Sequence, residues 1–389
     1  MLSSWKIGDG SLFFEIEQEK APVLFVARPR PPASDPWPPF YNGPVPAGSH
    51  TTRIALPALL VCASAALAAQ QRPRFTERVD VSRVLVDARV VDRQGQPIRG
   101  LRPEDFRVRI DGAEARVESA VWVDGGGVDR DGAPLPSTAI RGSAQPPAGR
   151  LIVFLFQKDL EPSRIVGLMR MLIQARSFLD TFRPEDRVAV TSFDSHLKIW
   201  IDFTGDMERV RRIFERGILF ERPGPIGSVD GISLVARLDP TRAKRAYSME
   251  EALLDIADAL EPLPGSKSLV IIGHGWGRLS GSTLFFDREY GHAVEAFQAG
   301  RVTVFTLDTT SADYHTLEAG LISVAETTGG FFERTHIFSQ RALDRLAGAL
   351  AGHYVLFVEK PFGPIGYHKV DVGLTRVKGT VMAKSGYVG

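Results

Sequence analysis

The sequence predicts an α/β protein with a doubly wound, mostly parallel sheet, preceded by a small antiparallel β-domain and ending in extra carboxyl-terminal strands. Three observations support this fold class. Continuous apolar runs, such as residues 151–156 (LIVFLF), are typical of strands buried on both faces. Segments with helical spacing of apolar residues alternate with these runs. Short segments that alternate between apolar and polar residues come before residue 124, and they indicate antiparallel strands.

The composition is that of an ordinary globular protein. The chain has 389 residues, of which 44% are hydrophobic and 24% are charged. Its 47 basic and 46 acidic residues give a formal net charge of +1, so nucleic acid is not an expected partner. The single cysteine, Cys62, excludes a disulfide framework within one chain and a zinc site built from several cysteines.

The first seventy residues predict export. Residues 1–44 are rich in proline without periodicity, and we interpret them as a non-native or disordered leader. Residues 45–69 are typical of a signal peptide, with a short apolar core followed by Ala66 and Ala68 in an A-x-A cleavage site. We therefore expect a location in the periplasm, at the cell surface or in the medium, with no stable membrane span after cleavage. The alternative is a proline-rich cytoplasmic tail before an uncleaved anchor.

A small β-domain is expected over residues 75–123. Asp111 and Gly112 form a strong hairpin signal, because both turn residues must adopt positive φ. A glycine- and proline-rich linker over residues 124–149 follows this domain. The strand-like segments of the domain are 79–91, 106–110 and 115–123.

Residues 150–389 are expected to form the α/β domain with a carboxyl-terminal β extension. Ser248 and Glu251 have the spacing of a capping box and open a helix. Helices are also expected at 163–182, 287–299, 317–327 and 340–350, and strands at 151–156, 188–190, 197–203, 268–272, 302–307 and 331–332. The extension comprises strand-like runs at 353–359, 368–375 and 379–384.

Three segments follow the carboxyl ends of predicted parallel strands, where open α/β sheets bind their ligands. They are residues 157–163 (QKDLEPS), 273–277 (GHGWG) and 308–310 (DTT). Trp276 in the second segment is either an exposed interface anchor or a ring packed on a neighbouring loop. Since no G-x-G-x-x-G or P-loop pattern is present, nucleotide binding is not expected.

Several short motifs occur in order along residues 75–389. They include GLRPEDF at 100–106, IDG at 110–112, RPEDRVAV at 183–190, GSKSLV at 265–270 and the closing strands through KSGY at 384–387. In these motifs and in the order of its elements, the chain resembles proteins related to the von Willebrand factor A domain, of the type widespread in Acidobacteria. The resemblance covers nearly all of residues 75–389.

The resemblance implies a divalent-cation adhesion site, which is degenerate in this chain. The family pattern D-x-S-x-S follows the first strand, and a later aspartate completes the site. Here Gln157 stands in place of the first aspartate, Asp159 and Glu161 in place of the serines, and His274 in place of the later aspartate. We therefore expect no metal and no cofactor. In the alternative reading, Asp159, Glu161 and His274 bind a transition metal.

The predicted function is that of an exported, non-enzymatic interaction or adhesion-type module. It would bind a protein or a cell-envelope component through loops at the carboxyl edge of the sheet. The alternatives are a divalent-metal-dependent adhesion protein and an uncharacterised hydrolase. The sequence contains no G-x-S-x-G elbow and no H-E-x-x-H motif, so no catalytic residue is assigned. The predicted binding residues are Gln157, Asp159, Glu161, Ser163, His274, Trp276 and Asp308.

Overall fold

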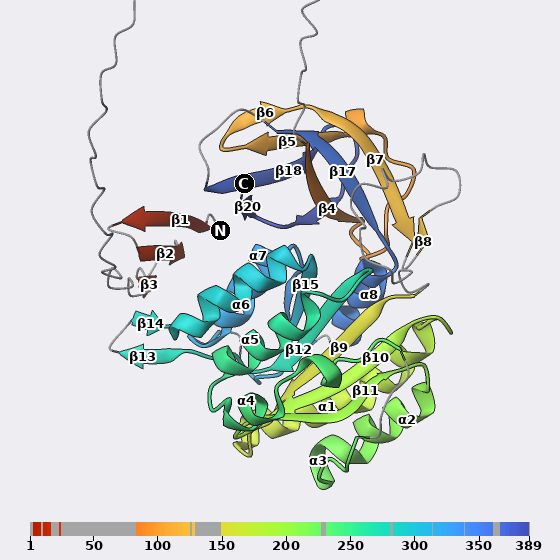
Figure 1. Ribbon diagram of the computed structural model, residues 1–389, viewed down its shortest axis with the longest axis vertical. Helices are drawn as coiled ribbons and strands as arrows, with labels where there is room; N and C mark the ends of the chain where they lie inside the picture. The colour runs from red at the N-terminus through yellow and green to blue at the C-terminus, as the bar shows by residue number, and fades with distance from the viewer. Residues whose placement is uncertain are drawn as a thin grey trace, which may run out of the picture. The chain divides into compact units, whose positions relative to one another are not determined.

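The computed structural model describes most of the chain after residue 82 (Figure 1). The described ranges are 83–124, 127–128, 149–226, 231–280, 283–312, 314–337, 339–360 and 366–388, with the backbone of three short strands, β1 (Ser3–Gly8), β2 (Ser11–Ile16) and β3 (Val23–Leu24). The predicted signal peptide (45–69) and most of the predicted linker (124–149) lie outside these residues.

A six-stranded, mostly parallel sheet forms the centre of the α/β domain, as the sequence predicts (Figure 1). The strand order is β11-β10-β9-β12-β15-β16, and only the β10–β11 pair is antiparallel. This order reverses direction between β9 and β12, which makes their carboxyl ends the switch point of the sheet. The strands are β9 (Leu151–Gln157), β10 (Arg187–Phe193), β11 (Leu197–Thr204), β12 (Lys267–Gly273), β15 (Val302–Asp308) and β16 (Phe332–Arg334).

Helices pack on both faces of this sheet, because its strands are apolar on both sides. Val153 and Leu155 of β9 belong to one hydrophobic cluster, and Phe154 and Phe156 belong to the other. The first cluster includes α4 (Pro240–Arg245), α5 (Met249–Leu260), α6 (Arg288–Ala299) and α7 (Glu318–Thr328). The second includes α1 (Pro162–Phe178), α2 (Met207–Arg212), α3 (Ile218–Phe220) and α8 (Ser339–Leu350).

Two antiparallel sheets form a β-sandwich around a third hydrophobic cluster. One has the strand order β19-β4-β17-β7-β8 and the other has the order β20-β18-β5-β6. The amino-terminal strands are β4 (Arg83–Val91), β5 (Phe106–Ile110), β6 (Ala113–Ala115), β7 (Val117–Asp124) and β8 (Gly127–Val128). The carboxyl-terminal strands are β17 (His353–Glu359), β18 (Tyr367–Leu374), β19 (Thr380–Ala383) and β20 (Gly386–Val388).

The carboxyl-terminal strands thus pair with the front segment, whereas the sequence grouped them with the α/β domain as an extension. β17 lies between β4 and β7, and β18 pairs with β5. Tyr354 of β17 secures this arrangement, because its buried hydroxyl donates to the Ile98 carbonyl at 2.9 Å and accepts from the Leu101 N–H at 3.0 Å. Pairing across such a sequence separation carries no local signal in either segment.

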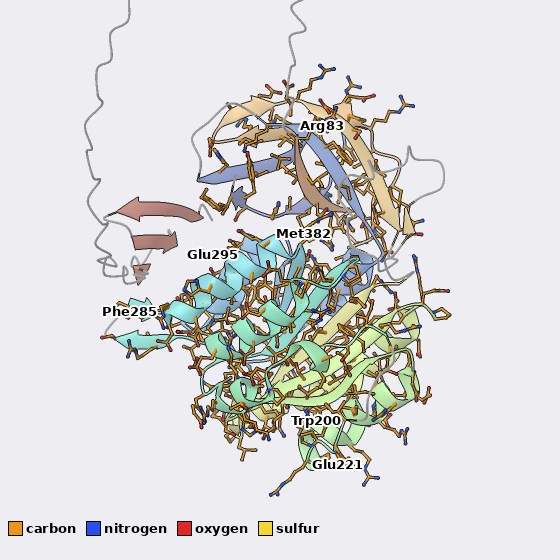
Figure 2. All side chains as sticks on the ribbon, viewed as in Figure 1. Arg83, Trp200, Glu221, Phe285, Glu295 and Met382 are labelled. Carbon is orange, nitrogen blue, oxygen red and sulfur yellow. The ribbon has the colours of Figure 1, made fainter. Side chains whose placement is uncertain are left out.

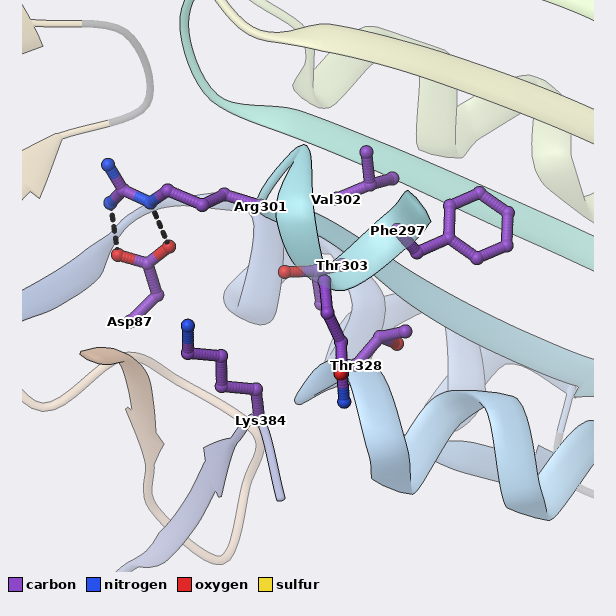
Figure 3. Close-up of a pocket in the computed structure, with 8 residues that line it drawn as sticks. Asp87, Phe297, Arg301, Val302, Thr303, Thr328 and Lys384 are labelled. Carbon is purple, nitrogen blue, oxygen red and sulfur yellow. Dashed lines mark hydrogen bonds and ion pairs between the residues drawn. The ribbon is translucent and has the colours of Figure 1, made fainter. Parts of the chain in front are cut away.

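Polar and apolar contacts join the β-sandwich to the α/β domain. Arg301, in the turn before β15, has a φ of 53° and directs its guanidinium onto both oxygens of Asp87 in β4, with a distance of 2.9 Å from Nε to Oδ2 (Figure 3). Lys384 lines the small cavity beside this pair, whose volume of about 10 Å³ has room for about one water molecule. Met382, labelled in Figure 2, extends the second hydrophobic cluster into β19.

Within the described ranges, no helix combines the length and apolar character needed to cross a bilayer.

Candidate functional site

The carboxyl ends of β9, β12 and β15 bring the predicted site segments into one row. In the parallel register, Phe156 lies opposite Ile272, and Gly273 lies opposite Asp308. The loops that leave these three strands therefore begin side by side at the switch point of the sheet. The sequence predicted this neighbourhood from strand ends alone.

Gln157, the last residue of β9, cross-links the loop that follows β12. Its side-chain Nε2 donates to the Gly275 carbonyl at 2.8 Å, and its Oε1 accepts from the His274 N–H at 3.0 Å. The side chain is buried, and Gly273 leaves space for it, since a Cβ at that position would lie 2.6 Å from Oε1. One neutral amide thus satisfies a buried donor and a buried acceptor of the neighbouring loop.

Asp159, Glu161 and Ser163 are the predicted binding residues that reach the surface. Asp159 accepts from the Glu161 N–H at 3.0 Å and forms an ion pair with Arg164. Partial burial would raise the pKa of Asp159, but these hydrogen bonds and the charge of Arg164 lower it. Glu161 accepts from the Ser163 hydroxyl. The acidic loop is therefore organised by its own hydrogen bonds where α1 begins.

His274 is buried, with 7% of its surface exposed. Burial, with Arg164 nearby, lowers the pKa of His274 to about 4, so the imidazole is neutral at physiological pH. Its Nε2 lies 3.8 Å from Asp159 Oδ2, and its Nδ1 has no hydrogen-bond partner. At that separation a neutral imidazole and a carboxylate form neither an ion pair nor a hydrogen bond.

Trp276 is packed inside the domain rather than presented as an exposed anchor. Only 4% of its surface is exposed. Gly320 of α7 makes room for the indole, because a Cβ there would lie 2.9 Å from the ring, and the Tyr290 ring centroid is 6.2 Å away. Of the two alternatives left open by the sequence, the structure therefore has the packed one.

Asp308 belongs to a largely buried cluster with His315 and Glu318, which was not predicted from the sequence. His315 Nε2 lies 2.9 Å from Asp308 Oδ2, and Glu318 receives two hydrogen bonds from Arg334, at 2.8 and 2.6 Å. One ligand atom from each of Asp308, His315 and Glu318 lies within 4.8 Å of the others, a set that suits a transition metal. Arg334, however, occupies both oxygens of Glu318 and its charge opposes a cation. The i, i+3 spacing of His315 and Glu318 at the start of α7 was the available sequence signal.

The most exposed apolar side chain near this edge is one that sequence reasoning missed. Leu160, in the loop between β9 and α1, is 85% exposed. The outward surface of α1 continues the apolar character, since Val166, Met169 and Ile173 are each at least 40% exposed and have i, i+3, i+7 spacing. We call these four residues the α1 face.

Comparisons with known proteins give fold likenesses only. No protein-family model and no curated protein matches the chain. Solved structures similar to it include a von Willebrand factor type A protein from Catenulispora acidiphila, at 10% identity over 73% of this chain and 74% of that one, with a TM-score of 0.38. An aerotolerance-related membrane protein from Bacteroides fragilis is 16% identical over 52% of this chain and 98% of that one, with a TM-score of 0.34.

A third similar structure is proximal thread matrix protein 1 from the mussel byssus, described with a zinc-occupied MIDAS motif. It is 12% identical over 55% of this chain and 48% of that one, with a TM-score of 0.32. These values do not show that the chain belongs to a family, and the bacterial distribution implied by the resemblance stays a prediction.

Proposed function

We propose that this protein is an exported, non-enzymatic interaction module whose ion-dependent adhesion site is degenerate. It binds a protein or cell-envelope partner through the loop between β9 and α1 and the adjoining α1 face. The observation that carries the proposal is the 85% exposure of Leu160 beside an apolar helix surface. An isolated exposed leucine is ordinary, but Leu160 comes just before a helix that exposes three apolar side chains on successive turns, and such a surface is of the kind that partners cover.

The hydrogen bonds of Gln157 support the absence of a cation from this edge. An ion held by both loops would need acidic or hydroxyl oxygens directed at it from each. In this chain the amide of Gln157 already joins the loops through the Gly275 carbonyl and the His274 N–H. The alternative, a metal-dependent adhesion protein, requires a divalent ion to displace these bonds or to bind Asp308 and His315.

The hydrolase alternative requires a nucleophile next to an imidazole. Within the described residues, no serine or threonine hydroxyl is hydrogen-bonded to His274 or His315, whereas a catalytic base must reach its nucleophile. Ser195 Oγ lies 3.1 Å from His196 Nδ1 in the loop between β10 and β11, but this exposed hydroxyl donates its proton to Asp194 at 3.0 Å rather than to the imidazole. We expect no ester or peptide turnover. Turnover by the wild type that His315→Ala abolishes would support the hydrolase instead.

Capture from an envelope extract tests the α1 face. The immobilised protein is compared with the Leu160→Ser/Ile173→Ser variant and with a Phe220→Ser control, because the exposure of Phe220 lies between those of Leu160 and Ile173 but the residue is on α3. Covering a leucine contributes about 1.5–3 kcal/mol, so the variant should bind its partner roughly 10- to 100-fold more weakly. The control should capture the partner as the wild type does.

The same capture with a chelator separates the metal-free module from the metal-dependent one. EDTA should leave the captured band unchanged, whereas its loss in EDTA and its return with Mg²⁺ would contradict the proposal. Equal capture by the wild type, the double variant and the control would also contradict it. Export is tested separately by the mass of the mature chain, and peptides from residues 1–40 in native material would argue against the leader interpretation.

A further inference from the structure

A cleft of about 400 Å³ lies between α4, α5 and the start of α6, away from the α1 face. Its volume is within the usual range for sites that hold small molecules or single side chains. The walls combine apolar atoms of Leu254 and Ala246 with charged groups. The charged side chains lining it are Asp239, Arg242, Arg245, Glu251, Asp255 and Glu289.

The charges in this cleft do not balance. Four carboxylates face two guanidinium groups. Arg242 is engaged by two carboxylates, since its Nε lies 2.5 Å from Asp255 and its Nη1 lies 2.8 Å from Asp258, which is outside the lining. Glu251 uses its carboxylate to accept from the N–H groups of Tyr247 and Ser248, but it keeps its negative charge. The cleft therefore has an excess of negative charge.

Asp255 is the most deeply buried carboxylate that is unpaired at one oxygen in this negatively charged cleft. Only 4% of the residue is exposed, and its Oδ2 has no hydrogen-bond partner, while Arg242 covers the other oxygen. Burial, opposed by the charge of Arg242 and assisted by neighbouring carboxylates such as Asp258, raises the pKa of Asp255 to about 6. A buried carboxylate oxygen without a donor is costly, so a donor supplied by a ligand would be favoured there.

We propose that this cleft binds a basic aliphatic side chain, the ammonium of a lysine or the guanidinium of an arginine presented by a peptide. Asp255 Oδ2 is closed to solvent in the free protein, so the cation would reach it as Arg242 moves aside from Asp255. The cation would also face Glu289, and its methylene stem would lie against Leu254. The cleft is too large for a bare metal ion to contact its opposite walls, and its apolar wall gives a metal ion no ligand. Arg242, whose side chain is 46% exposed, can stay paired with Asp258 when the ligand enters.

This site is independent of the proposed partner surface. It lies on the side of the sheet covered by α5 and α6, whereas the α1 face belongs to the opposite side. A variant that abolishes binding in the cleft therefore leaves partner binding by the α1 face open to test, and the reverse also holds.

Calorimetric titration with a matched pair of probes tests the proposal. N-acetyl-lysine methylamide carries the ammonium, and N-acetyl-norleucine methylamide has a similar stem without it. The lysine probe should bind the wild-type protein, and the norleucine probe should bind at least tenfold more weakly, because only the first makes a charge-assisted hydrogen bond. Equal binding of the two probes, or no heat with the lysine probe, overturns the assignment.

Variants locate the binding. Asp255→Asn should weaken the lysine probe about tenfold. Glu289→Gln, at the mouth of the cleft, provides a second test should Asp255→Asn fail to fold. Glu295→Gln is the matched control, since Glu295 is exposed on the same helix outside the lining (Figure 2).

The control should bind as the wild type does. Unchanged binding by the folded Asp255→Asn and Glu289→Gln variants overturns the proposal, as does displacement of the lysine probe by millimolar Mg²⁺ at constant ionic strength.

Discussion

Replacing Gln157 by glutamate tests whether a neutral amide holds the carboxyl edge of the sheet. The substitution keeps the length and shape of the side chain and keeps an oxygen that can accept from the His274 N–H. It removes only the Nε2 group that donates to the Gly275 carbonyl at 2.8 Å. At neutral pH it instead places a carboxylate oxygen against that carbonyl in a buried position.

The expected decrease in the free energy of unfolding follows from these contacts. One hydrogen bond contributes about 1 kcal/mol, and leaving the buried Gly275 carbonyl without a donor costs about 1–3 kcal/mol. Together with burial of the charge, the free energy of unfolding should fall by roughly 3 kcal/mol. For a domain of this size, such a change lowers the Tm by roughly 6–12 °C.

The pH dependence of this loss of stability follows from the pKa of the new carboxyl group. Burial raises the pKa of the new glutamic acid above its unfolded value, so the deficit is fully present above the raised pKa. Below the unfolded value of about 4.3, the protonated carboxyl donates to the Gly275 carbonyl and the deficit relative to the wild type shrinks. Paired urea denaturation of both proteins across this pH range measures the difference.

A matched control is Gln94→Glu, because Gln94 is an exposed turn residue and the change in charge is the same. It should leave the free energy of unfolding within about 0.5 kcal/mol of the wild type. Millimolar Mg²⁺ or EDTA should not move the wild-type Tm. A Gln157→Glu protein as stable as the wild type at neutral pH, or a wild-type Tm that rises with Mg²⁺, would refute the reasoning.

Three further predictions concern buried polar contacts, each measured by urea denaturation. Asp87→Asn should lower the free energy of unfolding by about 2 kcal/mol at neutral pH, because the effect of burial is outweighed by Arg301, which lowers the pKa of Asp87 from 3.8 to about 2. The loss should vanish as pH falls towards 2, and a loss that stays constant with pH would contradict this prediction. Asp186→Ala leaves Arg150 buried and unpaired, and a cost below about 3 kcal/mol would be unexpected. Tyr354→Phe leaves two buried backbone groups unpaired and should cost about 1–3 kcal/mol, whereas a neutral effect would show that its hydroxyl is dispensable.

Local features of the fold could be predicted because their causes lie within a few residues. Asp111 and Gly112 both have positive φ in the hairpin, as the turn requires. Ser248 and Glu251 form the capping box at the start of α5. The apolar run at 151–156 is a strand buried on both faces. In each case the deciding interaction is between neighbours in the sequence.

Other features depend on contacts between distant segments and had no local signal. The pairing of β17 with β4 joins residues more than 250 positions apart. The burial of Trp276 depends on Gly320, which leaves space for the ring. The exposure of Met169 depends on which side of α1 meets the sheet, and apolar residues extend from the buried side of this helix onto part of its exposed side, so their spacing alone does not mark the boundary. The strand ends predicted which loops begin side by side, but the hydrogen bond from Gln157 to Gly275 joins two segments far apart in the sequence and had no local signal.

In the proposed function, the amide of Gln157 takes the place of a bridging ion, and this changes what the carboxyl edge of the sheet responds to. A cation bridging two loops is exchangeable, so the loops would depend on its concentration and on a carboxylate supplied by the partner. The amide of Gln157 is covalently part of β9 and is satisfied without any partner, and it bonds His274 and Gly275 at the start of the loop after β12. The proposed function therefore assigns partner affinity to contact area rather than to a coordination bond, and the exposed apolar residues Leu160, Val166 and Ile173 would supply that area.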